Sequence, residues 1–80
     1  MTFTVRIARI RAVGSAGVDI VEAQVLDGFA VLGQTAVVRT HGLNDRLQIV
    51  GIGVERSDQS MLKLCFAHPS NLAVGDILSS

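Results

Sequence analysis

The 80-residue chain has very little cysteine, proline or aromatic content: one Cys, one Pro, three Phe, and neither Trp nor Tyr. A single cysteine, Cys65, cannot form an internal disulfide, which favours a reducing compartment. No apolar run approaches the ~20 residues of a membrane-spanning helix. The N-terminal segment MTFTVRIARIR lacks the apolar core of a secretory signal. We therefore expect a cytoplasmic protein that does not associate with membranes.

The chain also lacks an excess of either charge, because seven basic residues balance seven acidic ones. This balance excludes the general positive field of a protein that binds nucleic acid by charge alone. A local basic stretch remains, since no acidic residue precedes Asp19. Solvated arginines on an exposed strand are the more ordinary interpretation, and a phosphate-contacting patch is the alternative. The candidate binding surface consists of Arg6, Arg9, Arg11, Arg46 and Arg56.

Aromatic side chains on which bases could stack are scarce. Each phenylalanine (Phe3, Phe29 and Phe66) has apolar neighbours in the sequence. We expect most of them to lie in the core, which disfavours recognition of bases by stacking.

Hydrophobic patterning predicts strands throughout the chain. Phe3, Val5 and Ile7 alternate with polar residues, and the alternation slips after Ile7, which predicts a β-bulge. Similar β-branched runs separated by glycine-rich turns recur to the end, and the only helical feature expected is a single turn around residues 70–74. About six short strands indicate an all-β fold, a small closed antiparallel β-barrel in one domain over residues 1–80.

Glycines mark the expected turns, with structural roles assigned to Gly17, Gly28, Gly33 and Gly75. The stretch GFAVLGQT (28–35) is one lysine short of a phosphate-binding loop. Position 34 is Gln34, however, and the AVV that follows Thr35 favours a strand over the helix that such a loop requires. The stretch therefore predicts a strand, turn and strand, with no nucleotide bound.

Candidate catalytic residues do not form a convincing set. Cys65 lies in the apolar run LKLCFA, where a thiol is usually inert, and His41 and His68 fall in turns. A metal site of these three residues is only weakly indicated by their spacing. Asp19 and Glu22 are expected on a solvent-exposed face. We expect no enzymatic activity, catalytic residue, metal or cofactor.

Three segments resemble the second, β-barrel domain of elongation factor Tu and its relatives among the translational GTPases. They are IVEAQVLDGFAVLGQT (20–35), RLQIVGIGVER (46–56) and LAVGDIL (72–78), with Gly28 and Gly33 on two glycines of the family pattern. The resemblance implies a barrel that docks against a separate GTPase domain and, in tRNA carriers, helps to hold the aminoacylated 3′ end. The chain departs from the pattern at Gly53 and Gln34, where the family has acidic residues, and LKLCFA replaces L-L-R-G.

These observations favour a non-enzymatic binding module that engages another protein, or a second copy of itself. The candidate contact regions are residues 28–34 and the strand around Arg6 to Arg11. The alternative is an RNA-binding or translation-associated accessory protein that contacts tRNA or the ribosome through its arginines.

Overall fold

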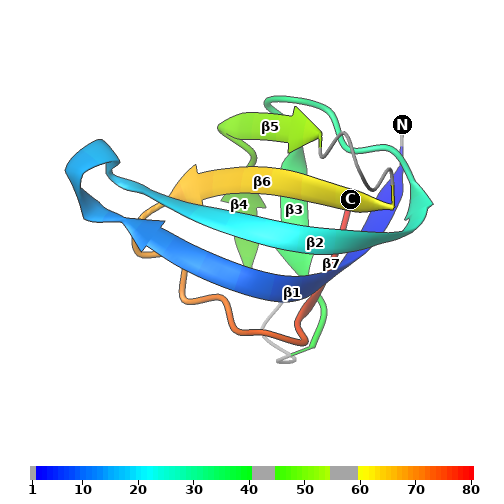
Figure 1. Ribbon diagram of the computed structural model, residues 1–80. Helices are drawn as coiled ribbons and strands as arrows, with labels where there is room; N and C mark the ends of the chain where they lie inside the picture. Colours follow the sequence, from blue (N-terminus) through cyan, green and yellow to red (C-terminus); the bar gives the residue numbers. More distant parts are fainter. Residues whose placement is uncertain (1, 41–44, 55–59) are drawn as a thin grey trace.

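The structure is a computed structural model that describes residues 2–40, 45–54 and 60–80. The described residues form seven strands and one 3-10 turn (Figure 1). In chain order the elements are β1 (Phe3–Val13), η1 (Gly14–Ala16), β2 (Val18–Gly28), β3 (Thr35–Val38), β4 (Arg46–Gln48), β5 (Gly51–Val54), β6 (Met61–Ala67) and β7 (Ile77–Ser79).

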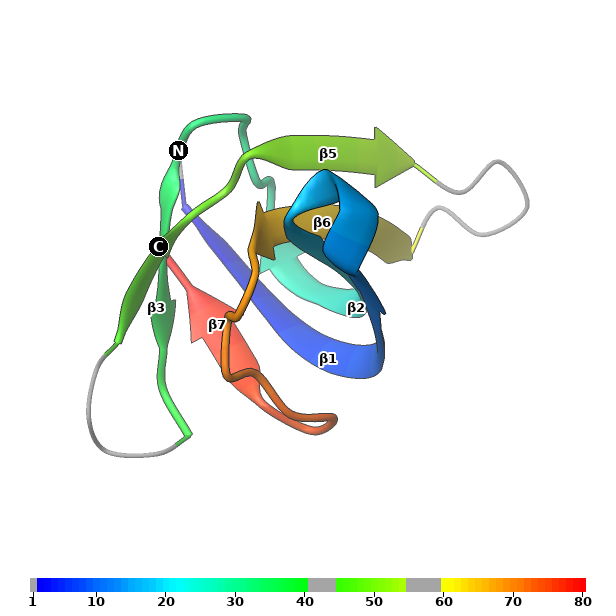
Figure 2. The same cartoon turned by 90° about the vertical axis from the view of Figure 1, so that its left-hand side faces the viewer.

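The strands form one antiparallel sheet in the order β4-β3-β7-β1-β2-β6-β5. The sheet is strongly curled into a half-barrel, with β3, β4 and β7 on one side and β2, β5 and β6 on the other (Figure 2). The predicted all-β antiparallel class is confirmed. The described chain has seven strands, where about six were expected, and the sheet is open, where a closed barrel was expected.

The two edge strands, β4 and β5, follow one another in the chain and are joined by Ile49 and Val50. The Ile49 amide still donates to the Gln34 carbonyl at 2.9 Å, whereas the next amide, of Val50, donates to the Cys65 carbonyl at 2.8 Å. The backbone therefore changes its pairing partner within two residues, from the β3 side of the half-barrel to β6. This bend divides residues 46–54 into two short strands.

The core fills the concave side of the sheet. Alternate residues of β1 and β2 point inward, because successive side chains of a strand lie on opposite faces. Among the described residues, eleven apolar side chains are buried there: Phe3, Val5, Ile7, Val21, Ala23, Ala36, Val38, Ile49, Leu64, Phe66 and Leu78. Phe3 and Phe66 are thus in the core, as expected for most of the phenylalanines, and Phe29 is the exception.

The predicted β-bulge after Ile7 is confirmed. The β1–β2 register shifts between Ile7 and Arg9, and again between Thr4 and Val5. Because the extra residue reverses the alternation, Arg9 and Arg11 share the outer face of the sheet while Ile10 packs against the core.

The four glycines named from the sequence all have positive φ: 67° at Gly17, 70° at Gly28, 85° at Gly33 and 93° at Gly75. Gly28 is additionally confined, because a Cβ there would collide with the backbone carbonyl of Thr2. The helical turn expected around residues 70–74 is not present, and the one short helical element in the described chain is η1. None of the described residues belongs to a helix long and apolar enough to cross a membrane.

Candidate functional site

Large apolar side chains are exposed in two neighbouring parts of the chain. Phe29 is 73% exposed and Leu32 63%, both in the connection between β2 and β3, and Val54 at the end of β5 is 65% exposed. Core side chains of the same types are nearly inaccessible, so these exposures contrast sharply with the rest of the sheet. We call the following set the apolar surface: Phe29, Val31, Leu32, Val50 and Val54.

The β2–β3 connection and β5 lie side by side. Phe29 and Val54 both line a depression of about 310 Å³, together with Val25, Gly28 and Leu62. At the other end of the connection, the Gly33 amide donates to the Ile49 carbonyl at 2.9 Å. The connection therefore lies beside β5 at Phe29 and is bonded to the β4–β5 link at Gly33.

Internal hydrogen bonds fix the shape of this connection. The Gln34 amide donates to the Val31 carbonyl at 3.0 Å, and the Val31 amide donates to Gln34 Oε1 at 3.0 Å. Gln34, the residue that stands where a phosphate-binding loop has lysine, thus closes its own turn. The Val31 amide is occupied by this side chain, so GFAVLGQT forms a structured turn that holds its apolar residues outward.

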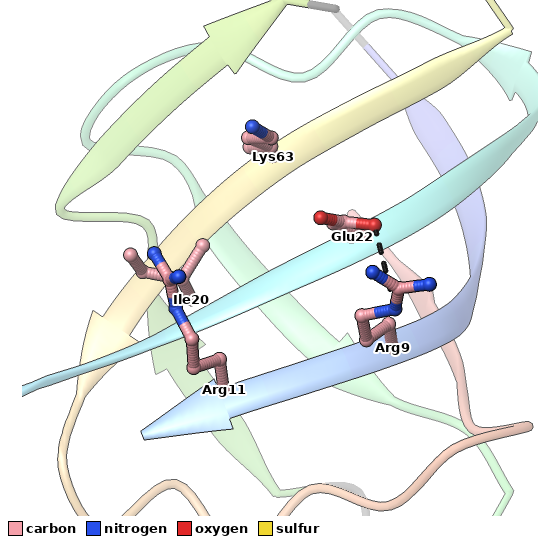
Figure 3. A pocket seen from close by; sticks show the side chains of 5 residues that line it. All are labelled: Arg9, Arg11, Ile20, Glu22 and Lys63. Carbon is pink, nitrogen blue, oxygen red and sulfur yellow. Dashed lines mark ion pairs between the residues drawn. The ribbon is translucent and has the colours of Figure 1, made fainter. Parts of the chain in front are cut away.

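A second depression, of about 210 Å³, lies on the outer face of β1, β2 and β6. Figure 3 shows Arg9 and Arg11 from β1, Ile20 and Glu22 from β2, and Lys63 from β6 around it. The β1–β2–β6 register places Arg9, Glu22 and Lys63 in one row across the three strands. Arg9 Nε lies 3.9 Å from Glu22 Oε2, so one carboxylate sits among three cationic groups.

The structure brings together only part of the arginine set named from the sequence. Arg6, Arg9 and Arg11 are all exposed on β1, with Arg6 opposite Gln24. Arg46 is on the edge strand β4, three positions away from β1 in the sheet order. Arg56 lies outside the described residues.

Lys63 is the residue of this basic depression that the sequence analysis missed. Its position follows from pairing, since Glu22 lies opposite Lys63 across β2 and β6. Pairing of the second strand with the sixth could not be read from local alternation.

Asp19 is a correction to the sequence analysis, which placed it on a solvent-exposed face. The residue is 6% exposed, and its carboxylate accepts three hydrogen bonds. Ser70 donates from its hydroxyl at 2.6 Å and from its amide at 3.0 Å, and His68 donates from Nδ1 at 2.6 Å. The hydrogen bonds from Ser70, with a smaller contribution from His68, hold the pKa of Asp19 below its ordinary value of 3.8.

This carboxylate ties β2 to the segment that follows β6. His68, expected in a turn, has a side chain 44% exposed and is oriented by Asp19. The Ser70 hydroxyl beside the pair is bound by Asp19, and Cys65 faces the opposite side of the sheet, where Gly51 leaves room for its Sγ. The arrangement is suited to anchoring the segment, because the charged acceptor satisfies buried donors of Ser70.

The metal set considered from the sequence is not assembled in the described residues, of which no three His, Cys, Asp or Glu side chains group together. His41, one member of that set, lies outside the described residues.

Comparison with protein-family models, curated proteins and solved structures finds no match for this chain. The fold therefore stands as a seven-stranded antiparallel half-barrel. The likeness to the translation-factor domain remains a resemblance carried by the three sequence segments.

Proposed function

We propose that this protein is a non-enzymatic binding module that engages a protein partner through the apolar surface. The observation that carries the proposal is the exposure of Phe29, Leu32 and Val54 on adjoining segments of an otherwise well-packed sheet. Exposed apolar residues that cluster, as opposed to single scattered ones, mark interaction sites on soluble proteins. Aromatic residues such as Phe29 are also enriched at the centres of protein interfaces.

The rigidity of the surface supports the same function. The turn closed by Gln34 and the bond from Gly33 to Ile49 hold the apolar side chains before a partner arrives. A preformed surface loses less conformational entropy on association than a flexible loop does. The resemblance to the translation-factor barrel, a domain that works by docking against another domain, agrees with this role in the cytoplasm.

A photoreactive amino acid at position 29, introduced in the native cell, tests the proposal. We expect discrete protein adducts from position 29 and none from the same group at Val74, which is 66% exposed and precedes Gly75, whose amide donates to the Ile7 carbonyl of β1. Identical adduct patterns at the two positions, or none at either, would contradict the proposal. An adduct that disappears on ribonuclease treatment would also contradict it.

RNA binding is the second candidate, and the basic depression of Arg9, Arg11 and Lys63 is the observation that favours it. Two features argue against RNA binding. Glu22 partly neutralises Arg9, and none of the five residues that line the depression is aromatic. Binding of labelled tRNA at low salt would fall steeply with added salt, and Arg11→Glu would weaken it more than Arg46→Glu on β4. No affinity at low salt would exclude this candidate.

A further inference from the structure

The pairing of β6 with its two neighbours shows which backbone groups of the edge strand β5 are left without a partner strand. The Val25 amide donates to the Ser60 carbonyl at 2.7 Å, and the His68 amide donates to the Gly17 carbonyl at 2.9 Å. The backbone amide and carbonyl groups of successive residues in a strand point toward opposite neighbouring strands. These two bonds therefore show that the backbone groups of the even-numbered residues of β6 point toward β2. The odd-numbered residues of β6 then bond to β5.

On β5 itself, the residues opposite these odd-numbered positions are Gly51 and Gly53. The amide and carbonyl groups of the alternate residues, Ile52 and Val54, consequently point off the sheet. No hydrogen bond from them to another described residue is recorded, and β5 is the last strand in the sheet order. The edge therefore offers two donors and two acceptors in register.

This edge lacks the features that usually prevent strands from pairing with other chains. Edge strands are commonly protected by charged side chains, especially lysine, or by proline. The opposite edge, β4, has the sequence RLQ with Arg46 and Gln48 exposed, whereas β5 reads GIGV without a charged residue. The two edges of one sheet thus differ, and only β5 suits strand addition.

We propose that β5 pairs antiparallel with β5 of a second copy of this chain, with Gly53 on the two-fold axis. This inference rests on the proposed function, since it names the partner at the apolar surface. The register joins Ile52 of each copy to Val54 of the other through four backbone hydrogen bonds, using the groups that point off the sheet. Gly53 then faces its own symmetry mate at the position where opposite Cα atoms approach most closely, about 4.5 Å.

The exposed side chains at the two ends of β5 favour a second copy as the occupant. Val50 precedes the strand and is 49% exposed, while Val54 ends it beside Phe29. In this register Val54 of each copy, which lies beside Phe29, is opposite Ile52 of its mate, so apolar side chains meet at both ends of the pairing. A symmetric interface uses the same patch twice, and here that patch is complementary to itself.

Sedimentation equilibrium over about 10 μM to 1 mM protein, the range for a short interface, tests the inference on the intact chain. We expect the mean mass to rise with concentration toward twice the 8.5 kDa of one chain. Val54→Lys places a charge beside each end of the pairing and should raise the dissociation constant roughly tenfold or more. Val74→Lys makes the same change at an equally exposed valine and should leave the dissociation constant unchanged.

A disulfide tests the register independently of any destabilising charge. A Cβ at Gly53 meets only ordinary contact, 3.6 Å from the Lys63 Cβ, so Gly53→Cys is compatible with the fold. In a Cys65→Ser background, mild oxidation should cross-link Gly53→Cys efficiently, since the approach of the two Cα atoms suits a disulfide. Gly14→Cys, in an open turn, controls for random collision.

A wild-type chain that stays monomeric to the highest concentration would overturn the inference, as would equal cross-linking of the Gly53→Cys and Gly14→Cys variants. These results differ from failure of the proposed function. A monomeric chain that still gives adducts to another protein from position 29 would keep the binding module and reject only self-pairing.

Discussion

Removal of the Asp19 carboxylate should be among the most destabilising single changes in this protein. The carboxylate accepts bonds from the Ser70 hydroxyl, the Ser70 amide and His68 Nδ1, and thereby fastens the segment after β6 to β2. Ser70 is 7% exposed, so its two donors have little access to water. Asp19→Ala would leave both of them without their acceptor.

The cost follows from the number of donors left unpaired. Each buried donor that loses its acceptor costs about 1–3 kcal/mol, and His68, being partly exposed, recovers its bond from water. We therefore expect Asp19→Ala to lower the free energy of unfolding by about 2–4 kcal/mol. A domain of this length has a total stability of roughly 4–12 kcal/mol, so the change would be a large fraction. Asp27→Ala, at an exposed position of the same strand, should change it by less than about 0.5 kcal/mol.

The pH dependence supplies a second measure of the same carboxylate. Because folding lowers the pKa of Asp19 below 3.8, its contribution is complete above that value and is lost as pH falls through the lower folded-state pKa. Urea unfolding followed by far-UV circular dichroism should show this loss in the wild type below about pH 4. Asp19→Asn, which does not titrate, should lack that part of the acid loss. Equal stabilities of wild type and Asp19→Ala at pH 7, or parallel pH profiles for wild type and Asp19→Asn, would refute the reasoning.

Three further changes test the backbone and the turn. Gly28→Ala, which combines positive φ with a collision against the N-terminal backbone, should cost about 2–4 kcal/mol in urea unfolding, and Gly14→Ala close to nothing. Gly51→Ala brings a Cβ to 3.0 Å from the Cβ and 3.1 Å from the Sγ of Cys65. Its loss of unfolding free energy should therefore be smaller in a Cys65→Gly background, which a double-mutant cycle measures. Gln34→Lys completes the phosphate-loop pattern yet should give no ATP or GTP binding by calorimetry; measurable affinity would contradict the turn assignment.

Local patterning was sufficient to predict several parts of the fold. The alternation in β1 and its slip after Ile7 both depend on neighbouring residues, because side-chain alternation acts over a few positions of one strand. The division of residues 46–54 into two separate strands was not predicted. Residues 46–54 alternate as one strand, and only the competition between β3 and β6 for their backbone divides them.

The candidate surfaces show the same division. The β2–β3 turn was proposed as a contact region from residues 28–34 alone, while its association with Val54 of β5 required the structure. Likewise, the basic stretch on β1 was visible in the sequence, but Lys63 joins Arg9 and Arg11 only through pairing of β6 with β2. Residues far apart in the chain meet through strand order, which alternation does not encode.

By itself, the sequence determined that the chain forms antiparallel strands separated by glycine turns, because side-chain alternation and positive-φ positions act over a few residues. Tertiary structure decided which strands became edges and which polar group became buried. Asp19 was expected to face solvent because it is charged, but it shares the inward parity of Val21 and Ala23 and is covered by the segment carrying His68 and Ser70. The Asp19 carboxylate can be buried because the segment that covers it also supplies the hydrogen-bond donors of Ser70 and His68.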